Sequence, residues 1–189
     1  MNYLAHLHLS HDTPGLMIGA LLGDVVKGPL KGEYPADWEQ GIRLHRRIDA
    51  YTDSHALIRA CQADFPKKFR RFSPIMLDVV FDHFLIKHWQ QFHPQILATF
   101  STEMYQFLSN THWPAAAQPH VKRIVKHDLL NRYQEWDFII EVIASIGLRM
   151  RVTNPLADTD EILAQHYQQI EGTFLQFYPQ LQQHVNGMQ

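Results

Sequence analysis

Apolar residues recur at intervals of three and four along almost the whole chain, which is the spacing of amphipathic helices, and no alternating run is long enough to indicate a sheet. Prolines and glycines interrupt this pattern where helices are expected to begin and end. We therefore predict a single all-α domain that spans residues 1–189, with eight or nine helices and a loop over 31–35. The predicted helices lie at about 2–11, 16–26, 36–55, 57–65, 74–92, 94–108, 119–132, 135–150 and 159–178.

The predicted helix over residues 74–92 places acidic residues in a strongly apolar stretch. Asp78 and Asp82 are four residues apart, so they share a helix face, and His83 follows directly. An unpaired carboxylate in the core is unfavourable by several kcal/mol even after the protein relaxes. These acids therefore need a partner, which can be an arginine, a hydrogen-bond network or a metal ion.

Two further apolar helices carry ionisable groups of the same kind. Asp24 ends the apolar stretch 17–26, and His45, Asp49 and Asp53 form one stripe at spacings of four residues. Carboxylates together with neutral imidazoles suit Mn²⁺, Mg²⁺, Fe²⁺ or Zn²⁺. Such ions activate water and bind phosphoryl oxygens. The spacing therefore predicts a divalent-metal site shared by several helices.

The residues around this stripe leave two interpretations open. Three arginines on the same predicted helix could neutralise a phosphate by bidentate contacts: Arg43, Arg46 and Arg47. The same arginines could instead form a structural ion pair with Asp49 on a neighbouring turn. His6 lies in an apolar segment, where a hydrogen-bonded core histidine is the simplest expectation and an outer metal ligand is the alternative.

Composition narrows the class of protein. The formal net charge of −2 does not direct the chain to nucleic acid or to an anionic membrane. Cys61 is the only cysteine, which excludes an internal disulfide and fits a reducing compartment. Because we find no signal peptide and no apolar run of ~20 residues, we expect a soluble, cytoplasmic protein. The oligomeric state stays open.

The sequence resembles the acyl carrier protein phosphodiesterases, also called acyl carrier protein hydrolases, in segments that follow one another along nearly the whole chain. These segments are MNYLAHLHL at 1–9, LGDVVKG at 22–28, GIRLHRRIDAYTD at 41–53, LDVVFDHFL at 77–85, WDFI at 136–139 and FLQFYP at 174–179. The two central segments are the most specific, and they contain the acids and histidines described above.

The resemblance implies a helical fold similar to the HD-domain phosphohydrolases and a divalent metal cofactor. Mn²⁺ is the expected ion, with Mg²⁺, Fe²⁺ or Co²⁺ as alternatives. The implied reaction hydrolyses the phosphodiester that joins 4′-phosphopantetheine to a serine of holo-acyl carrier protein, which gives apo-protein and free 4′-phosphopantetheine. Carrier proteins are acidic, so an exposed basic cluster could steer their docking. The candidate cluster consists of Lys67, Lys68, Arg70 and Arg71, and Arg43 is the alternative.

The residues that the resemblance carries over as the site are Asp24, His45, Asp49, Asp78, Asp82 and His83. All of these except Asp78 are expected metal ligands, and Asp78 is expected just outside them. Arg46 or Arg47 would stabilise charge on the phosphoryl group, and His83 or His45 would protonate the leaving oxygen. One departure stands out, because Asp82-His83 reverses the adjacent His-Asp order of the wider HD pattern.

Two other functions share parts of this pattern. An HD-type nucleotide phosphohydrolase would use the same metal site without docking a protein. A non-enzymatic helical binding module would pair its buried acids with arginines and would bind no divalent metal.

Overall fold

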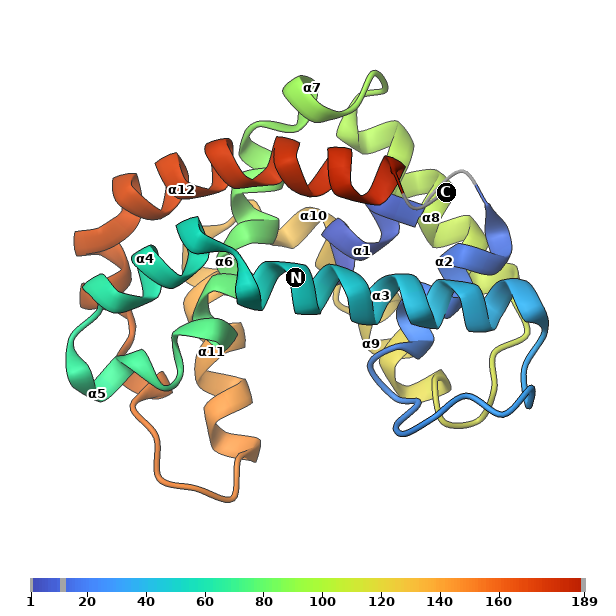
Figure 1. Cartoon of the computed structure of the whole chain (residues 1–189), viewed down its shortest axis with the longest axis horizontal. Coiled ribbons are helices and arrows are strands. Elements are labelled where there is room, and N and C mark those ends of the chain that lie inside the picture. The colour runs from blue at the N-terminus through green and yellow to red at the C-terminus, as the bar shows by residue number, and fades with distance from the viewer. Residues whose placement is uncertain (1, 11–12, 188–189) are drawn as a thin grey trace.

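The computed structural model describes residues 2–10 and 13–187, and all regular structure in these ranges is helical (Figure 1). The longer helices are α1 (Tyr3–Ser10), α2 (Pro14–Leu22), α3 (Ala36–Ser54), α4 (Ala56–Asp64), α6 (Ser73–Lys87), α8 (Leu97–Asn110), α9 (Gln118–Lys126), α11 (Trp136–Arg149) and α12 (Asp160–Asn186). Single turns form α5 (Lys67–Arg70), α7 (Trp89–Phe92), α10 (Leu129–Arg132) and the 3₁₀ helix η1 (Leu156–Asp158). The predicted all-α class is confirmed, and nine of these helices have eight residues or more.

Several predicted helix boundaries are wrong, each for a local reason. The predicted helix over 74–92 is divided at His88, and the helix over 119–132 is divided at Asp128, whose φ of 50° is left-handed. The second helix ends at Leu22, so Asp24 lies in the turn that follows. The last helix continues through Pro179 to Asn186, because the apolar face that it buries continues beyond the proline.

Glycines allow α2 and α3 to cross with their backbones in contact. A Cβ atom on Gly19 would overlap the backbone of α3 at Trp38, and a Cβ atom on Gly41 would overlap the backbone of α2 at Leu16. Gly23, just after α2, leaves room for a side chain of α3, because a Cβ atom there would overlap the ring of His45. The crossing therefore fixes His45 and the turn that contains Asp24 relative to each other.

Helix α1 lies in the middle of the molecule, where it packs against α2, α3 and α6 (Figure 1). Every residue of α1 after Tyr3 is buried. Helix α6 is buried over most of its surface, and α12 runs the length of one side and contributes Phe174, Phe177 and Tyr178 to the core. Polar side chains of α1 therefore lie in the protein interior and must find partners there.

No helix in the described ranges combines the length and the apolar character that crossing a membrane requires.

Candidate metal centre

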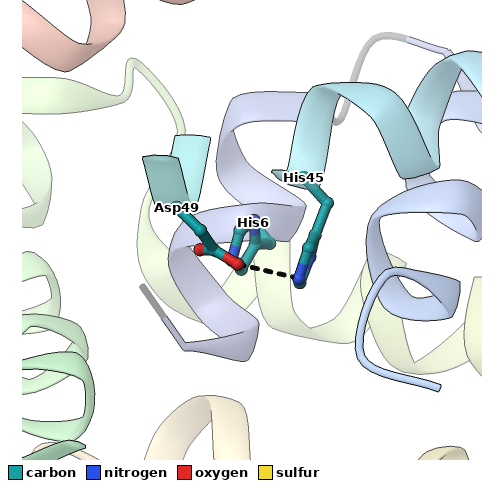
Figure 2. A group of neighbouring side chains, drawn as sticks. All are labelled: His6, His45 and Asp49. Atoms are coloured by element: carbon teal, nitrogen blue, oxygen red, sulfur yellow. Dashed lines mark ion pairs between the residues drawn. The ribbon is translucent and has the colours of Figure 1, made fainter. Parts of the chain in front are cut away.

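Helices α1 and α3 bring two histidines and one aspartate together. Figure 2 shows His6 from α1 beside His45 and Asp49 from α3, with Asp49 one turn after His45. The Nε2 atom of His6 lies 3.2 Å from Oδ1 of Asp49, and Nε2 of His45 lies 3.1 Å from Oδ2 of the same carboxylate. One possible ligand atom from each residue lies within 4.8 Å of the other two, and the described residues contain no other such group of three.

The two imidazole rings are buried, whereas the carboxylate reaches the surface. His6 and His45 are 2% and 4% exposed, while the side chain of Asp49 is 40% exposed. The rings stack with their centroids 3.9 Å apart and an interplanar angle of 18°. The cluster is therefore closed on the side of the histidines and open to solvent on the side of the aspartate.

Several nitrogen atoms in this cluster lack hydrogen bonds. Both ring nitrogens of His6 and Nδ1 of His45 are buried without a hydrogen-bond partner. The Nε2 atom of His6 is close to Asp49, but their relative orientation does not make a hydrogen bond. Since buried polar atoms are nearly always hydrogen-bonded, these atoms indicate a missing partner. A divalent cation between the imidazoles and the carboxylate would be a partner for one nitrogen of each ring, the Nε2 atoms that face Asp49.

The protonation states suit metal ligation. Burial, with a smaller contribution from neighbouring His45, lowers the pKa of His6 to about 4 despite the opposing effect of Asp49. Burial alone would raise the pKa of Asp49, but the neighbouring imidazoles of His45 and His6 outweigh it and hold the pKa well below its usual range. At neutral pH the cluster thus contains a neutral His6 and an ionised Asp49, which are the forms that bind metal.

Asp24 lies at the edge of the cluster. Its Oδ1 atom is 3.8 Å from Nε2 of His45, and its side chain is 44% exposed. The structure therefore brings together the sequence-predicted residues Asp24, His45 and Asp49, and it adds His6 to them. The sequence offers His6 as a core histidine or as an outer ligand, because it lies in an apolar segment. Its role depends on the packing of α1 against α3.

Asp82 is held by hydrogen bonds, which are one of the three kinds of partner that the sequence left open. Its Oδ2 and Oδ1 atoms accept hydrogen bonds from the backbone amides of Leu4 and Ala5, at 2.9 and 3.1 Å. These amides belong to the first turn of α1, where they have no partner within the helix. Burial raises the pKa of Asp82 to about 7, against the effect of the two hydrogen bonds. We therefore remove Asp82 from the proposed metal ligands, because it fixes the helix that carries His6.

His83 and Asp78 also lie outside the cluster. The two ring nitrogens of His83 lie 2.9 Å from the carbonyl oxygen of Tyr133 and 2.9 Å from the hydroxyl of Tyr167, so protein groups occupy both. We therefore remove His83 from the proposed ligands and from the candidate proton donors. Asp78 is half-buried on α6, and after burial its charge is the main cause that raises the pKa of Asp53.

The arginines of α3 differ in their environments. Arg46 donates a hydrogen bond of 2.9 Å to the carbonyl oxygen of Val26, which ties α3 to the segment that follows Asp24. Arg43 pairs with Glu39 at 2.8 Å. Arg47 is exposed and lines a shallow hollow beside Tyr51 and His184 on the outer side of α3. None of these contacts places a guanidinium at the cluster, and Asp49 pairs with histidines.

Comparisons with known proteins agree along the whole chain. The family model described as acyl carrier protein phosphodiesterase matches residues 1–181. Proteins named acyl carrier protein phosphodiesterase from Serratia proteamaculans (strain 568) and Yersinia pestis are 39% and 37% identical over 193 and 194 residues, and each match covers 100% of both chains. A protein of the same name from Escherichia coli O6:H1 is 35% identical over 98% of each chain.

No solved structure matches, so the likeness to HD-domain folds stays a prediction. The chain belongs to the acyl carrier protein phosphodiesterase family.

Proposed function

We propose that this protein is a metal-dependent phosphodiesterase that releases 4′-phosphopantetheine from the serine of holo-acyl carrier protein. The family assignment supports the substrate and the reaction. The observation that carries the metal dependence is the cluster of His6, His45 and Asp49, whose buried ring nitrogens lack hydrogen-bond partners.

The donor set narrows the choice of metal. His6, His45 and Asp49 would hold the ion, and Asp24 is near enough to His45 to join them. A divalent ion bound there would supply Lewis acidity, which lowers the pKa of water and neutralises phosphoryl charge. Because two imidazoles accompany the carboxylates, the set favours Mn²⁺, Fe²⁺ or Co²⁺ over Mg²⁺, which prefers oxygen ligands.

The side chains of the cluster have separable tasks. One oxygen of the Asp49 carboxylate faces Nε2 of His6 and the other faces Nε2 of His45, so the three groups would hold one ion between them. Burial keeps His6 neutral and thus able to bind a cation. The exposed side of the cluster, at Asp49 and Asp24, admits the phosphodiester. In the reaction the oxygen of water bonds to phosphorus, the bond from phosphorus to the serine oxygen breaks, and one proton of the water passes to that serine oxygen.

A basic surface around α5 suits an acidic partner. Phe69 is buried and anchors this short helix, whereas the basic residues on either side of it are exposed. The ammonium group of Lys68 lies 4.6 Å from the centroid of the Phe69 ring. The exposed basic residues, which we call the α5 basic surface, are Lys67, Lys68, Arg70 and Arg71. We propose that this surface increases the rate at which acyl carrier protein associates.

A direct experiment is to incubate chelator-treated protein with holo-acyl carrier protein, with and without Mn²⁺, and to measure the mass of the carrier. We expect loss of the phosphopantetheine mass only when Mn²⁺ is present. An unchanged carrier mass under both conditions contradicts the proposal. Turnover of free nucleotides instead would indicate the nucleotide phosphohydrolase, and the absence of both turnover and metal binding would indicate the binding module.

A further inference from the structure

A cleft of about 420 Å³ lies between α9 and α11. Arg123 and His127 line it from the side of α9, and Arg149 lines it from the end of α11. Apolar side chains complete the wall, namely Leu129, Phe138 and Val142. The cleft thus combines a cationic part with an apolar part, and the sequence pattern had assigned no function to any of these residues.

The two arginines of the cleft are close to each other. Burial and then the charge of Arg123 lower the pKa of Arg149. Arg149 donates a hydrogen bond of 3.0 Å to the hydroxyl of Ser145, and Glu141 is the one acidic residue among those that line the cleft. Two guanidinium groups that face one cavity repel each other, and an anion between them relieves that repulsion by charge-assisted hydrogen bonds.

A chain of contacts connects this cleft to the metal cluster. The ring of Phe138 packs against the ring of Tyr133 with centroids 5.8 Å apart. The hydroxyl of Tyr133 accepts a hydrogen bond of 3.0 Å from the side-chain amide of Asn2, which directly precedes α1. His6 lies on the next turn of α1. Tyr133 therefore connects the apolar wall of the cleft with the residue that precedes α1, the helix that carries His6.

Tyr3 gives a second, electrostatic link between the two places. Its pKa is raised by burial and then by the charge of Asp24, while the charges of Arg123 and Arg149 act in the opposite direction. The hydroxyl of Tyr3 is therefore close enough to sense Asp24, at the edge of the metal cluster, as well as both arginines of the cleft. The charges at the edge of the cluster and in the cleft thus act on one hydroxyl.

We propose that this cleft is the subsite for the 4′-phosphopantetheine arm, with Arg123 and Arg149 on the same phosphoryl group that faces the metal cluster during the reaction and with the apolar wall along the chain of the arm. The inference rests on the proposed function and adds the place where the arm binds. The arm has a single anionic end joined to a chain with a branched apolar carbon and two amides. The cleft offers both kinds of chemistry, the cationic groups and the apolar side chains of Leu129, Phe138 and Val142.

Binding of the free product tests this subsite without depending on turnover. Titration calorimetry with 4′-phosphopantetheine, on metal-free protein, would compare the wild type with Arg123→Gln and Arg149→Gln. We expect each variant to bind about tenfold more weakly, the equivalent of about 1.4 kcal/mol for one lost charge-assisted contact. Pantetheine, which lacks the phosphate, should bind all these proteins alike. Arg151→Gln removes an exposed arginine that does not line the cleft, and it should change nothing.

Three outcomes overturn the subsite. Wild-type protein that fails to bind 4′-phosphopantetheine contradicts it, and so do arginine variants that bind as tightly as the wild type. The third outcome is weaker binding of apo-acyl carrier protein by these variants with unchanged binding of 4′-phosphopantetheine, which would assign the arginines to a carboxylate of the carrier. Circular dichroism checks that the variants fold, and Arg149→Lys provides a second variant that keeps the charge.

The proposed function is tested separately by turnover. If the wild type cleaves holo-acyl carrier protein and the arginine variants bind the product normally, the subsite is wrong and the function stands. If the wild type cleaves nothing but binds 4′-phosphopantetheine through both arginines, the function is wrong and the subsite stands.

Discussion

The imidazole rings of His6 and His45 stack with their centroids 3.9 Å apart although they come from helices separated by more than twenty residues of chain. Two protonated imidazoles in this arrangement would repel each other, and the charge of His45 indeed contributes to lowering the pKa of His6. Neutral rings avoid this repulsion, and neutral imidazoles are the form that binds a metal cation. The pair is therefore the structural basis of our proposal for the metal centre.

Metal binding should stabilise the folded protein through His6. At a concentration of Mn²⁺ 100 times its dissociation constant, mass action predicts about 2.7 kcal/mol of stabilisation. For a chain of this length that corresponds to a rise in melting temperature of roughly 5–10 °C. Differential scanning calorimetry should show the rise in wild type and not in His6→Gln. His8→Gln is the control, because His8 lies on the same helix but hydrogen-bonds to Tyr178. A shift of the same size in His6→Gln would contradict the assignment.

Replacing Asp82 by Asn should destabilise the fold. The asparagine side chain presents an NH₂ group to one of the two α1 amides that Asp82 now satisfies, so one buried donor loses its acceptor. We expect a cost of about 1–3 kcal/mol in urea unfolding. Asp137→Asn, which changes an exposed acid in the first turn of α11, should cost less than about 1 kcal/mol. Equal effects of the two substitutions would show that Asp82 does not hold α1.

Asp82 should also give the stability a characteristic dependence on pH. Burial raises its pKa in the folded state to about 7, against a usual value of 3.8. Between about pH 4 and pH 7 the folded protein thus retains a proton that the unfolded chain has lost. The free energy of unfolding therefore falls as the pH rises through this window, by up to ~1.4 kcal/mol per pH unit.

The measurement is urea unfolding from pH 4.5 to 7.5 in wild type and in Asp82→Asn. Other groups titrate in both proteins, so the difference between the two curves isolates Asp82. As the pH rises, the wild type should lose stability relative to Asp82→Asn. Parallel curves over the whole range would rule out a proton on Asp82 in the folded state.

Gly23→Ala should impair the site more than the fold. A Cβ atom at this position overlaps the ring of His45, so the ring must move away from His6 and Asp49. Because displacements of about 1 Å in a catalytic site can reduce rates by about 100-fold, we expect a loss of that order in kcat/KM. Gly172→Ala is the matched control, since a Cβ atom there meets nothing within 4 Å, and it should leave activity unchanged. Wild-type turnover by Gly23→Ala would show that the position of His45 is not critical.

Reversing charge on the α5 basic surface should slow association with the carrier protein. The double variant Lys68→Glu, Arg71→Glu should lower kcat/KM at low ionic strength and reduce its dependence on salt, with kcat unchanged. The double variant Lys122→Glu, Lys126→Glu, at exposed positions of α9, makes the same change in net charge and is the control. If the salt dependence of the double variant equals that of the wild type, the carrier protein docks elsewhere.

The sequence predicted those candidate site residues that a local pattern indicates. The i, i+4 spacing of His45 and Asp49 is a local property, and so is the position of Asp24 at the end of an apolar stretch. The sequence also indicates that Asp82 needs a partner, but it leaves an arginine, a hydrogen-bond network and a metal ion open, because the amides at the beginning of α1 are 77 and 78 residues away in sequence. Contacts of this kind depend on tertiary packing, and a helical periodicity does not contain them.

His6 was not among the ligands expected from the sequence, and the reason is again tertiary packing. His6 lies among Leu4, Ala5 and Leu7, and this surrounding is typical of a core histidine. Only the approach of α1 to α3 gives it a carboxylate partner. The all-α class and most helix centres follow from periodicity, whereas the breaks at His88 and Asp128 and the continuation through Pro179 depend on local backbone geometry and on packing.

The most direct test of the proposed metal centre is the affinity of the protein for Mn²⁺, measured by electron paramagnetic resonance of the free ion during titration. We predict tight binding of Mn²⁺ by the wild type and a decrease in affinity of more than about 100-fold in His6→Gln, since even the loss of an outer-shell partner reduces metal affinity by roughly 10–100-fold. Absence of bound Mn²⁺ in the wild type, or equal affinity in His6→Gln, would contradict the claim that His6, His45 and Asp49 form the metal centre.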